Sequence, residues 1–320
     1  MIVCWRYAME ITKRAYTTED DFWRMRAFLR EAMAENNLTE KCWHVARLDY
    51  ARWHVMMNCA KVSLNEVASI WQEGDRIVGI VLPDGGLGEA HIMIRPGFGT
   101  HELEAEMIAH AERMLAEEVQ GQGRSLCVWT PSDNKLRISL LNERGYARKG
   151  AAEMQWEKEL PAKLEPSPLP PGYAVRPLGD GLELLERCYS SGLGFHGGDI
   201  AVGIENREDP TWYRNIQTAP LYRRDLDLVA VAPDGSIASF CTIWFDDVTR
   251  TAYFEPVATI PSKQRMGLGR AVLTEGLIRL SRMGAVKAFV GGYSQGANAL
   301  YSSVFGPVYN TYEPWCRKLE

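Results

Sequence analysis

The chain has 320 residues, 46% hydrophobic and 24% charged, and this composition excludes a disordered or fibrous protein. Its 36 basic and 41 acidic residues give a formal net charge of −5, which excludes phosphate neutralisation on nucleic acid as its main task. The length exceeds one typical domain and fits two domains of about 150 residues each.

Seven cysteines are scattered along the chain without a C-x-x-C motif. Their odd number and irregular spacing predict free thiols in a reducing compartment, and neither a disulfide framework nor a zinc site. The six histidines show no metal-ligand spacing, so we expect no metal. The first six residues lack the apolar stretch of a signal peptide, and no run of about 18 apolar residues occurs. We therefore predict a cytoplasmic protein that does not bind membranes.

Two short segments of the first half recur in the second half at one spacing. Trp156–Leu160 and Trp315–Leu319 end the two halves 159 positions apart. The turn signal at Asp75 recurs at Asp234 with the same spacing, and each turn leads into an apolar strand. Such repeated spacing predicts a duplicated fold.

Five prolines lie between residues 161 and 172, at the midpoint of the chain. Because proline fixes φ and has no N–H, we predict an extended, semi-rigid linker over residues 161–172. The sequence is thereby divided into a first domain over residues 1–160 and a second domain over residues 173–320. We expect a monomer or a homodimer.

Apolar periodicity and turn signals predict six strands and three helices after the linker. The strands cover residues 173–178, 226–232, 237–245, 251–260, 286–290 and 309–319, and the helices cover residues 180–191, 267–283 and 295–304. This order predicts an α/β fold with one mixed sheet and helices on its faces.

The strand over residues 251–260 leads into a helix that has Gly267 and Gly269 at its start. The first N–H groups of a helix have no partner within it, and glycine lets a phosphate approach the backbone closely. Arg265 and Arg270 add positive charge, so a diphosphate is the expected ligand. A tight turn that binds nothing is the alternative.

Two nucleotide-binding motifs do not fit this loop. A P-loop requires G-K-[ST] after its glycines, and that sequence is missing here. A dinucleotide-binding turn requires a third glycine or alanine, where Val272 stands, and an acidic residue on the next strand, which carries Lys287 instead.

The segment Gln264-x-x-Gly267-x-Gly269 after a strand resembles the acetyl-CoA loop of the GCN5-related N-acetyltransferases (GNAT). A Leu-Tyr pair, Leu300-Tyr301, resembles a second signature of that family. The resemblance covers residues 173–319 and implies acetyl-CoA as co-substrate. It implies that the strand before the loop splays from its neighbour and binds the pantetheine arm. The cofactor-binding residues it implies are Val257, Ala258, Thr259, Gln264, Arg265, Met266, Gly267, Leu268, Gly269, Arg270 and Asn298.

Together with the duplication, the whole chain resembles the tandem acetyltransferases of the mycothiol synthase type, with two GNAT-type acyl-CoA N-acyltransferase domains. The first half departs from the family at the loop. When Ile94-Arg-Pro96 is aligned with Ile260-Pro261, Glu102 and Glu104 replace the two glycines, and these carboxylates would repel a pyrophosphate. Leu140-Leu141 replaces the Leu-Tyr pair. We therefore expect residues 1–160 to form a degenerate, non-catalytic copy; a second enzyme with an unusual loop is the alternative.

Acyl transfer to an amine needs a base for the amine proton and an acid for the leaving thiolate. Glu255 is the candidate base, because alternation along a strand places residues 253, 255 and 257 on one face beside the expected acetyl site. The family's glutamate lies two positions earlier, where this chain has Tyr253, so a solvated carboxylate is the alternative. Tyr301 is the candidate acid, with a packed helix tyrosine as its alternative. The Val257 N–H is placed to stabilise the thioester oxygen.

Two further groups of acidic residues are candidates for a role at the active site. Asp246 and Asp247 are rival bases, but their position at a turn predicts solvated surface charge. The segment His196–Glu205, which includes Asp199, follows the first helix of the second domain, where the family has its substrate loop. It is a candidate for binding a cationic amine, with a surface loop as the alternative.

These observations predict an N-acetyltransferase that moves an acetyl group from acetyl-CoA directly to a primary amine of a small molecule or a peptide. The catalytic residues are expected within residues 173–320. Two alternatives stay open: a non-catalytic protein that binds acyl-CoA or another protein, and an acyltransferase that uses a longer acyl-CoA.

Overall fold

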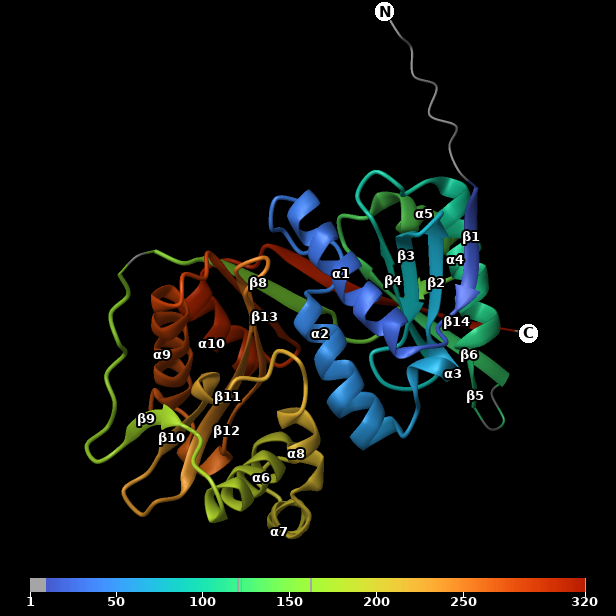
Figure 1. Cartoon of the computed structure of the whole chain (residues 1–320). Coiled ribbons are helices and arrows are strands. Elements are labelled where there is room, and N and C mark those ends of the chain that lie inside the picture. Colours follow the sequence, from blue (N-terminus) through green and yellow to red (C-terminus); the bar gives the residue numbers. More distant parts are fainter. Residues whose placement is uncertain (1–9, 120, 122, 162, 320) are drawn as a thin grey trace, which may run out of the picture. The chain divides into compact units, whose positions relative to one another are not determined.

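The computed structural model describes residues 10–119, 121, 123–161 and 163–319 (Figure 1). The chain forms two compact units. Unit 1 contains the residues up to Leu48, residues 55–150 and the residues from Glu313 onward, and unit 2 contains residues 49–54 and 151–312. The units therefore do not follow the two halves of the sequence strictly. The last strand of the first half belongs to unit 2, and most of the last strand of the second half belongs to unit 1.

Unit 1 has a mixed sheet whose strands run in the order β1-β2-β3-β4-β6-β14, with β5 paired to β6 and β7 paired to β14. Helices α1 and α2 lie on one side of this sheet, and α4 and α5 on the other (Figure 1). The elements are β1 Ile11–Ala15, α1 Glu19–Glu35, α2 Val45–Tyr50, the π-helix η1 Ala51–Ala60, α3 Leu64–Val67, β2 Ser69–Glu73, β3 Arg76–Leu82, β4 Glu89–Ile94, α4 His101–Met114, β5 Glu117–Val119, β6 Gly123–Pro131, α5 Lys135–Glu143 and β7 Ala147–Arg148.

Unit 2 has a second mixed sheet, in the order β9-β10-β11-β12-β13-β8, and the first residues of β14 pair with β8. Only β12 and β13 are parallel neighbours. The elements are β8 Glu153–Glu159, β9 Ala174–Pro177, α6 Leu182–Phe195, α7 Ile200–Glu208, α8 Thr211–Gln217, η2 Arg224–Leu226, β10 Asp227–Val231, β11 Ile237–Asp246, β12 Thr251–Thr259, η3 Pro261–Lys263, α9 Leu268–Arg282, β13 Lys287–Gly292, α10 Gln295–Phe305 and β14 Asn310–Leu319.

Each strand and helix predicted for the second half is present, with bounds that differ by a few residues. The α/β class and the duplicated order of elements are confirmed. Helices α7 and α8 were not predicted. Residues 196–205 were expected to form a loop, but residues 200–208 form α7, which Asp199 caps through its side chain. The proline-rich residues 163–170 contain no helix or strand.

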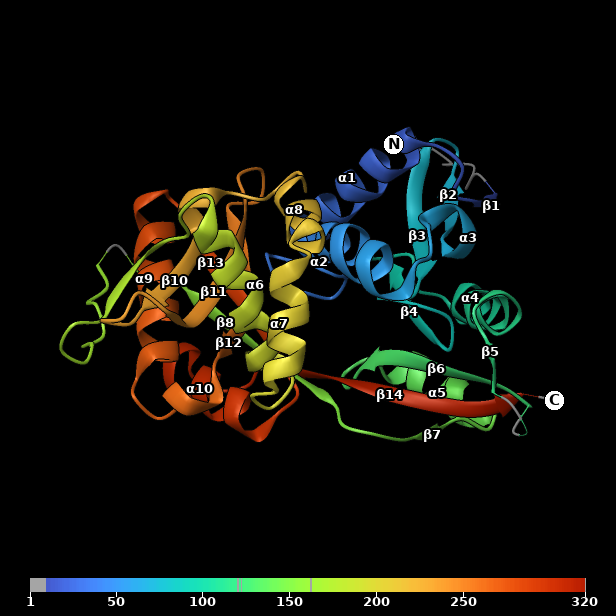
Figure 2. The ribbon, with the colours of Figure 1, turned by 90° about the horizontal axis from the view of Figure 1, so that it is seen from below.

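Helices cover both faces of the unit 2 sheet. Helices α9 and α10 lie on one face, and α6 and α7 lie on the other (Figures 1 and 2). We call these the α9 face and the α6 face. The α9 face carries the apolar core, which includes Trp156, Phe254 and Tyr301. Val272, Gly276 and Leu280, spaced four apart on α9, are all buried, as their spacing predicts.

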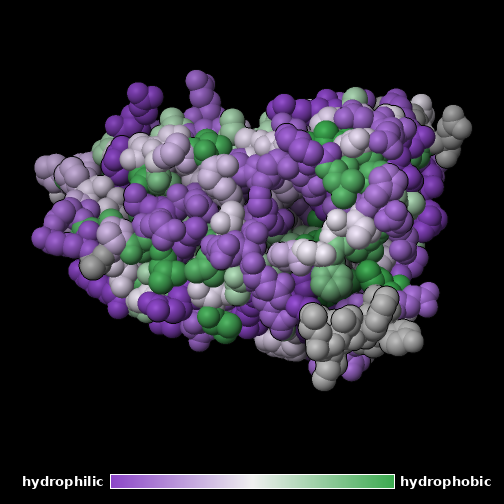
Figure 3. All heavy atoms as spheres, turned by 90° about the horizontal axis from the view of Figure 1, so that it is seen from above, coloured by the Kyte–Doolittle hydropathy of each residue, from purple (hydrophilic) through white to green (hydrophobic). Residues whose placement is uncertain are grey.

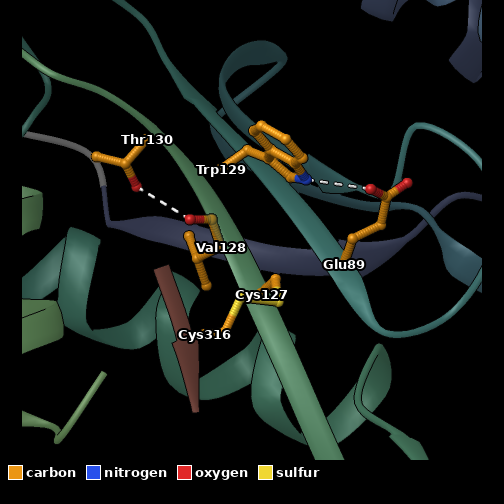
Figure 4. Close-up of a disulfide and its surroundings, with 6 residues drawn as sticks. All are labelled: Glu89, Cys127, Val128, Trp129, Thr130 and Cys316. Carbon is orange, nitrogen blue, oxygen red and sulfur yellow. Dashed lines mark hydrogen bonds between the residues drawn. A yellow bond between two sulfur atoms is a disulfide. The ribbon is translucent and has the colours of Figure 1, made fainter. Parts of the chain in front are cut away.

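One cysteine pair corrects the expectation that all thiols are free. Cys127 on β6 and Cys316 on β14 form a disulfide within unit 1 (Figure 4). Trp129, two residues beyond Cys127 on β6, donates through Nε1 to the Glu89 carboxylate at 3.1 Å. The two cysteines lie 189 positions apart, so the linear sequence gives no sign that they meet. Of the others that the structure describes, Cys59 is exposed, and Cys42, Cys188 and Cys241 are buried free thiols.

Polar and charged side chains cover most of the face drawn in Figure 3, with smaller apolar areas between them. Across the described residues, no helix is both long and apolar enough to cross a membrane.

Candidate active site

The loop between β12 and α9 ends in an uncapped helix start. Gly267 is the N-cap of α9 and has φ 81°, in the left-handed region that glycine tolerates, and no side chain caps the helix. Residues 264–267 are all exposed. The first N–H groups of α9 therefore have no side-chain cap at the positive end of the helix dipole, which is an arrangement that binds anions.

The two glycines of the loop meet different requirements. A β-carbon on Gly267 would contact nothing within 4 Å, so its role is conformational. A β-carbon on Gly269 would lie 3.0 Å from Leu300 Cδ2 and 3.2 Å from Thr259 Oγ1. Gly269 thus lets α9 pack closely against both α10 and the end of β12.

Two of the polar side chains in this region already have protein partners. Gln264 donates through Nε2 to the Thr259 carbonyl at 3.2 Å, which ties the loop to the end of β12. Arg270 donates through Nη1 to the Ser303 carbonyl on α10 at 3.2 Å. The side chain of Arg265 is exposed, and its φ is 65°. Met266 is 37% exposed, whereas Leu268 is buried in the core.

Strands β12 and β13 separate toward the loop. They pair only from Thr251 with Lys287 to Tyr253 with Phe289. Past that point β13 pairs with β8 on its other side, and β12 pairs with β11. A gap between the two parallel strands follows, and it opens toward the start of α9.

Backbone groups of β12 point into this gap. The Ile260 N–H donates to Ala238 on β11 at 3.0 Å, and successive residues of a strand direct their N–H groups to opposite sides. The N–H groups of Val257 and Thr259 are therefore directed away from β11 and toward the gap. Val257, Ala258 and Thr259 are all partly exposed.

A bulge at Glu255-Pro256 corrects the predicted alternation along β12. Cys241 pairs with Val257 and Trp244 pairs with Tyr253, and the register shifts between these pairs. Paired residues share a face, so Val257 lies on the α9 face and Tyr253 on the α6 face. Residues 253, 255 and 257 do not share one face. The extra residue shifts the alternation of side chains between the two faces at the position of Glu255, which is partly exposed.

Tyr301 lies on α10, on the α9 face of the sheet. Its ring packs edge-on against Trp156 at 5.5 Å, and it is 5% exposed. A β-carbon on Gly292 would lie 2.9 Å from Tyr301 Cε2, so that glycine makes room for the ring. Its hydroxyl has no hydrogen-bond partner among the described residues. Burial raises the pKa of Tyr301, and the nearby charges of Cys241, Glu255 and Glu153 raise it further.

The separated strands and the uncapped, glycine-containing helix start lie within a segment that a family model matches. Residues 184–306 match the model described as the acetyltransferase (GNAT) family. Over these residues the chain is similar to the GNAT family, whose model is described as an acetyltransferase, and this supports an acyltransferase class for the chain.

Solved structures extend the GNAT likeness to the whole chain. A tandem GNAT protein from the clavulanic acid biosynthesis pathway is 12% identical with a TM-score of 0.66, over 97% of this chain and 98% of that one. An acetyltransferase of the GNAT family from Colwellia psychrerythraea is 11% identical with a TM-score of 0.59, over 96% and 100% of the two chains. A GCN5-related N-acetyltransferase from Sphaerobacter thermophilus is 14% identical with a TM-score of 0.58, over 96% and 95%. The chain therefore has a tandem GNAT fold. No curated protein matches it by sequence.

Three other predicted site residues of the GNAT domain lie as follows. Asn298 on α10, with its amide nitrogen turned inward, donates to the carbonyls of Gly292 at 3.1 Å and Ser294 at 3.2 Å. Asp246 is not solvated as predicted, because it is 0% exposed and accepts from Thr249. Asp247 is exposed. Only Asn298 of the three lies beside Tyr301.

The segment after α6 lies beside the end of β12. A β-carbon on Gly194 would be 2.9 Å from the Ala258 Cβ, and one on Gly198 would be 3.4 Å from Pro261 Cγ. His196, at the C-cap of α6, bonds to the Gly192 carbonyl, and Asp199 is used as the α7 cap. The segment is thus near the candidate site, although its acidic residue already serves the helix.

Sequence reasoning missed Glu153. It lies on β8, which the first half of the sequence contributes to unit 2, and it is 4% exposed. Its charge reaches Tyr301. The recurrence of Trp156 at Trp315 marks equivalent strands in the two halves, but it gives no sign that the strands are exchanged between the units.

Unit 1 has the same strand separation, but side chains fill it. Strand β4 pairs with β6 only from Glu89 to His91. Just past that point Arg137 of α5 donates to the Ile92 carbonyl at 2.8 Å and makes two bonds to Glu104, at 2.7 and 3.0 Å. Both Arg137 and Glu104 are 3% exposed.

The helix start of unit 1 is also closed. Thr100 caps α4 by accepting from the Leu103 N–H at 3.2 Å, where α9 has Gly267 and no cap. By helix start, Thr100 is the counterpart of Gly267 and Glu102 that of Gly269, which corrects the predicted alignment by two positions. The free anion-binding groups of unit 2 thus have capped or charged counterparts in unit 1.

Proposed function

We propose that the chain is an acetyl-CoA-dependent N-acetyltransferase that acts on a primary amine, with its active site in unit 2. The observation that supports this best is the gap between β12 and β13 that opens onto the uncapped start of α9. Backbone N–H groups line the gap, and the helix end supplies a positive field for a diphosphate. In this reading the gap receives the pantetheine arm.

The residues present suit such a co-substrate. The pyrophosphate would lie on the N–H groups that follow Gly267, with the exposed Arg265 adding charge. The Val257 and Thr259 backbone groups would bind the pantetheine arm along the gap, beside Ala258. Gln264 and Arg270 support the loop through their own bonds to Thr259 and Ser303, so we assign them to holding its shape. Asn298 holds the start of α10 in the same way.

The chain's own groups suffice for direct transfer. Glu255 accepts a proton from the ammonium, and the neutral nitrogen then forms the new bond to the acyl carbon while the carbon–sulfur bond breaks; the second proton that this nitrogen loses restores the Tyr301 hydroxyl once the phenol has protonated the thiolate. Tyr301 donates its hydroxyl proton to the leaving thiolate, and its raised pKa keeps that proton available at neutral pH. The Val257 N–H stabilises the charge on the thioester oxygen.

The first half is proposed to be the non-catalytic copy. In unit 1 the Arg137 guanidinium lies in the separation between β4 and β6, and Glu104 stands behind it at the helix start. An acyl-CoA would have to displace a buried ion pair there. The contribution of β8 to unit 2 gives this half a structural role in the catalytic unit.

The proposal also covers the acceptor and the acyl group: the acceptor is a small-molecule or peptide amine, and the acyl group is acetyl. Tyr301 favours catalysis over simple acyl-CoA binding, because a binder has no use for an acid near the sulfur. A cytoplasmic location is part of the proposal, although the Cys127–Cys316 disulfide is unusual for a reducing compartment.

Calorimetry with acetyl-CoA tests the loop assignment. Gly267→Glu should weaken binding at least tenfold, because it places a carboxylate at the pyrophosphate position. Gly235→Glu is a matched control: it also has a left-handed φ, 85° against 81°, and space for a β-carbon, but lies in the turn between β10 and β11. Equal affinity in the two variants would remove the loop from the proposal.

Release of free CoA thiol with amine acceptors tests the catalytic roles. Glu255→Gln should lower kcat and abolish the rising limb of its pH profile, and Tyr301→Phe should lower kcat with unchanged acetyl-CoA affinity. A Glu255→Gln enzyme with the wild-type pH profile would exclude that carboxylate as the base.

A further inference from the structure

Gln155 on β8 is a fully buried residue with a polar side chain. It is 0% exposed, and neither its amide nitrogen nor its amide oxygen has a hydrogen bond among the described residues. A buried amide without hydrogen bonds destabilises the fold relative to one whose hydrogen bonds are satisfied. Because the unpaired amide does not stabilise the fold, we infer that a ligand supplies its missing hydrogen bonds.

The strand register places Gln155 beside the candidate site. It pairs with Gly291 at the end of β13, where β13 has already separated from β12. Tyr253 on β12 pairs with Phe289, which pairs with Glu157 on β8. Since paired residues share a face, the side chains of Gln155, Tyr253 and Glu153 all stand on the α6 face. Tyr301 lies on the opposite face, across the same gap.

Gly291 lets two of these side chains converge. A β-carbon on Gly291 would overlap Glu153 Oε1 and lie 3.0 Å from the Tyr253 hydroxyl oxygen. The carboxylate and the phenol therefore meet above the glycine, which is the residue that pairs with Gln155. Gly291 and Glu255 are partly exposed, so a ligand reaches the edge of this cluster from the gap.

We propose that Glu153, Gln155 and Tyr253, the β8 cluster, recognise the acceptor, and that the acceptor is a small primary amine carrying a carboxamide. The inference rests on the proposed function and adds the substrate class to it. The unpaired amide of Gln155 offers one donor and one acceptor in a plane, and a second carboxamide satisfies both at once. The carboxylate of Glu153 favours the cationic amine as it binds.

The position of the cluster agrees with the direction of transfer. The charges of Glu153 and Glu255 both raise the pKa of Tyr301, so both carboxylates lie near enough to act on this phenol. An amine held by Glu153 on the α6 face is adjacent to Glu255 on β12, and the thiol leaves on the α9 face beside Tyr301. Glu153 and Gln155 act as specificity-determining residues that the first half of the sequence supplies.

The test variant is Gln155→Met, which keeps the side-chain length and removes both unpaired polar atoms. The probes are glycinamide, ethanolamine and propylamine, each assayed with acetyl-CoA by release of free CoA thiol. The wild type should use glycinamide with a kcat/KM at least tenfold above that of the other two, and Gln155→Met should lose this preference. Glu153→Gln should lower kcat/KM for all three amines. Glu157→Gln is the matched control, because Glu157 lies two residues further along β8 on the same face and is ion-paired with Lys287. This variant should change neither the preference for glycinamide nor the kcat/KM for the three amines.

A stability measurement separates recognition from a purely structural role. Because the amide of Gln155 has no partner, Gln155→Met should leave the melting temperature equal or higher, with unchanged acetyl-CoA affinity. A clear loss of stability would overturn the proposal, as would equal use of the three amines by the wild type or an unchanged preference in the variant. Acetyl-CoA binding without turnover of glycinamide would overturn it while leaving the acyl-CoA site intact, whereas absence of acetyl-CoA binding would refute the proposed function itself.

Discussion

The carboxylate of Glu153 occupies the space that a side chain on Gly291 would need. The two residues lie on neighbouring strands of unit 2, diagonal to one another in the β8–β13 register. On the next residue, Gly292, the missing side chain makes room on the opposite face for Tyr301 and Asn298. The end of β13 is therefore a pair of glycines with polar side chains packed over both faces of the strand.

Gly291→Ala should disable the enzyme without unfolding it. The added methyl group meets only the ends of Glu153 and Tyr253, which can turn away, so the melting temperature should change by a few degrees at most. The displaced carboxylate should lower kcat/KM for amines at least tenfold and leave acetyl-CoA affinity unchanged. Gly296→Ala on α10 is the matched control, since its β-carbon would contact nothing within 4 Å. Wild-type kcat/KM in Gly291→Ala would show that the Glu153 position is not critical.

The order of elements and the loop could be predicted from the sequence, because both follow from local patterns. Alternation and glycine placement indicated β12 and the start of α9, and the structure has both. The bulge at Glu255-Pro256 could not be predicted, since one unpaired residue changes no periodicity that the sequence displays. The position of Glu153 and Gln155 in unit 2 could not be predicted either. A strand that pairs within the other unit has the same sequence pattern as one that pairs within its own unit. Helix α7 was missed because the glycines before it are typical of a loop.

The Arg137–Glu104 pair in unit 1 should behave as a buried ion pair. Both side chains are enclosed, and Arg137 also bonds to the Ile92 carbonyl. Arg137→Leu should lower the unfolding free energy by about 3–5 kcal/mol, because it leaves the Glu104 carboxylate buried and unpaired. The double variant Arg137→Leu/Glu104→Met should recover most of that loss, as measured by urea unfolding. A double variant as unstable as the single one would mean that packing, not charge, holds this site.

The disulfide should stabilise unit 1 measurably. It closes a loop with a sequence separation of 189, and chain entropy alone predicts a stabilisation of about 5 kcal/mol for a loop of that length. The Cys127→Ser/Cys316→Ser variant should therefore unfold at a lower urea concentration than the wild type. A reductant should shift the wild type toward the variant and leave the variant unchanged, while Cys59→Ser, at an exposed free thiol, should change nothing. If the reductant shifts neither midpoint, the disulfide does not form in the protein.

His110 should make unit 1 less stable below neutral pH. Burial, together with the charges of Lys13 and Arg113 and against that of Glu106, lowers its pKa to about 4, and the ring hydrogen-bonds to Ser69 Oγ at 2.7 Å. The folded protein therefore keeps this histidine neutral, whereas the unfolded chain protonates it near pH 6.5. The stabilisation is complete above pH 6.5 and is lost as the pH falls toward 4, with a loss of about 2 kcal/mol between pH 7 and pH 5. Urea unfolding at the two pH values checks this: His110→Gln should lose about 2 kcal/mol less than the wild type over the same interval, because glutamine does not titrate. Equal losses in the two proteins would mean that His110 is protonated in the folded state at pH 5.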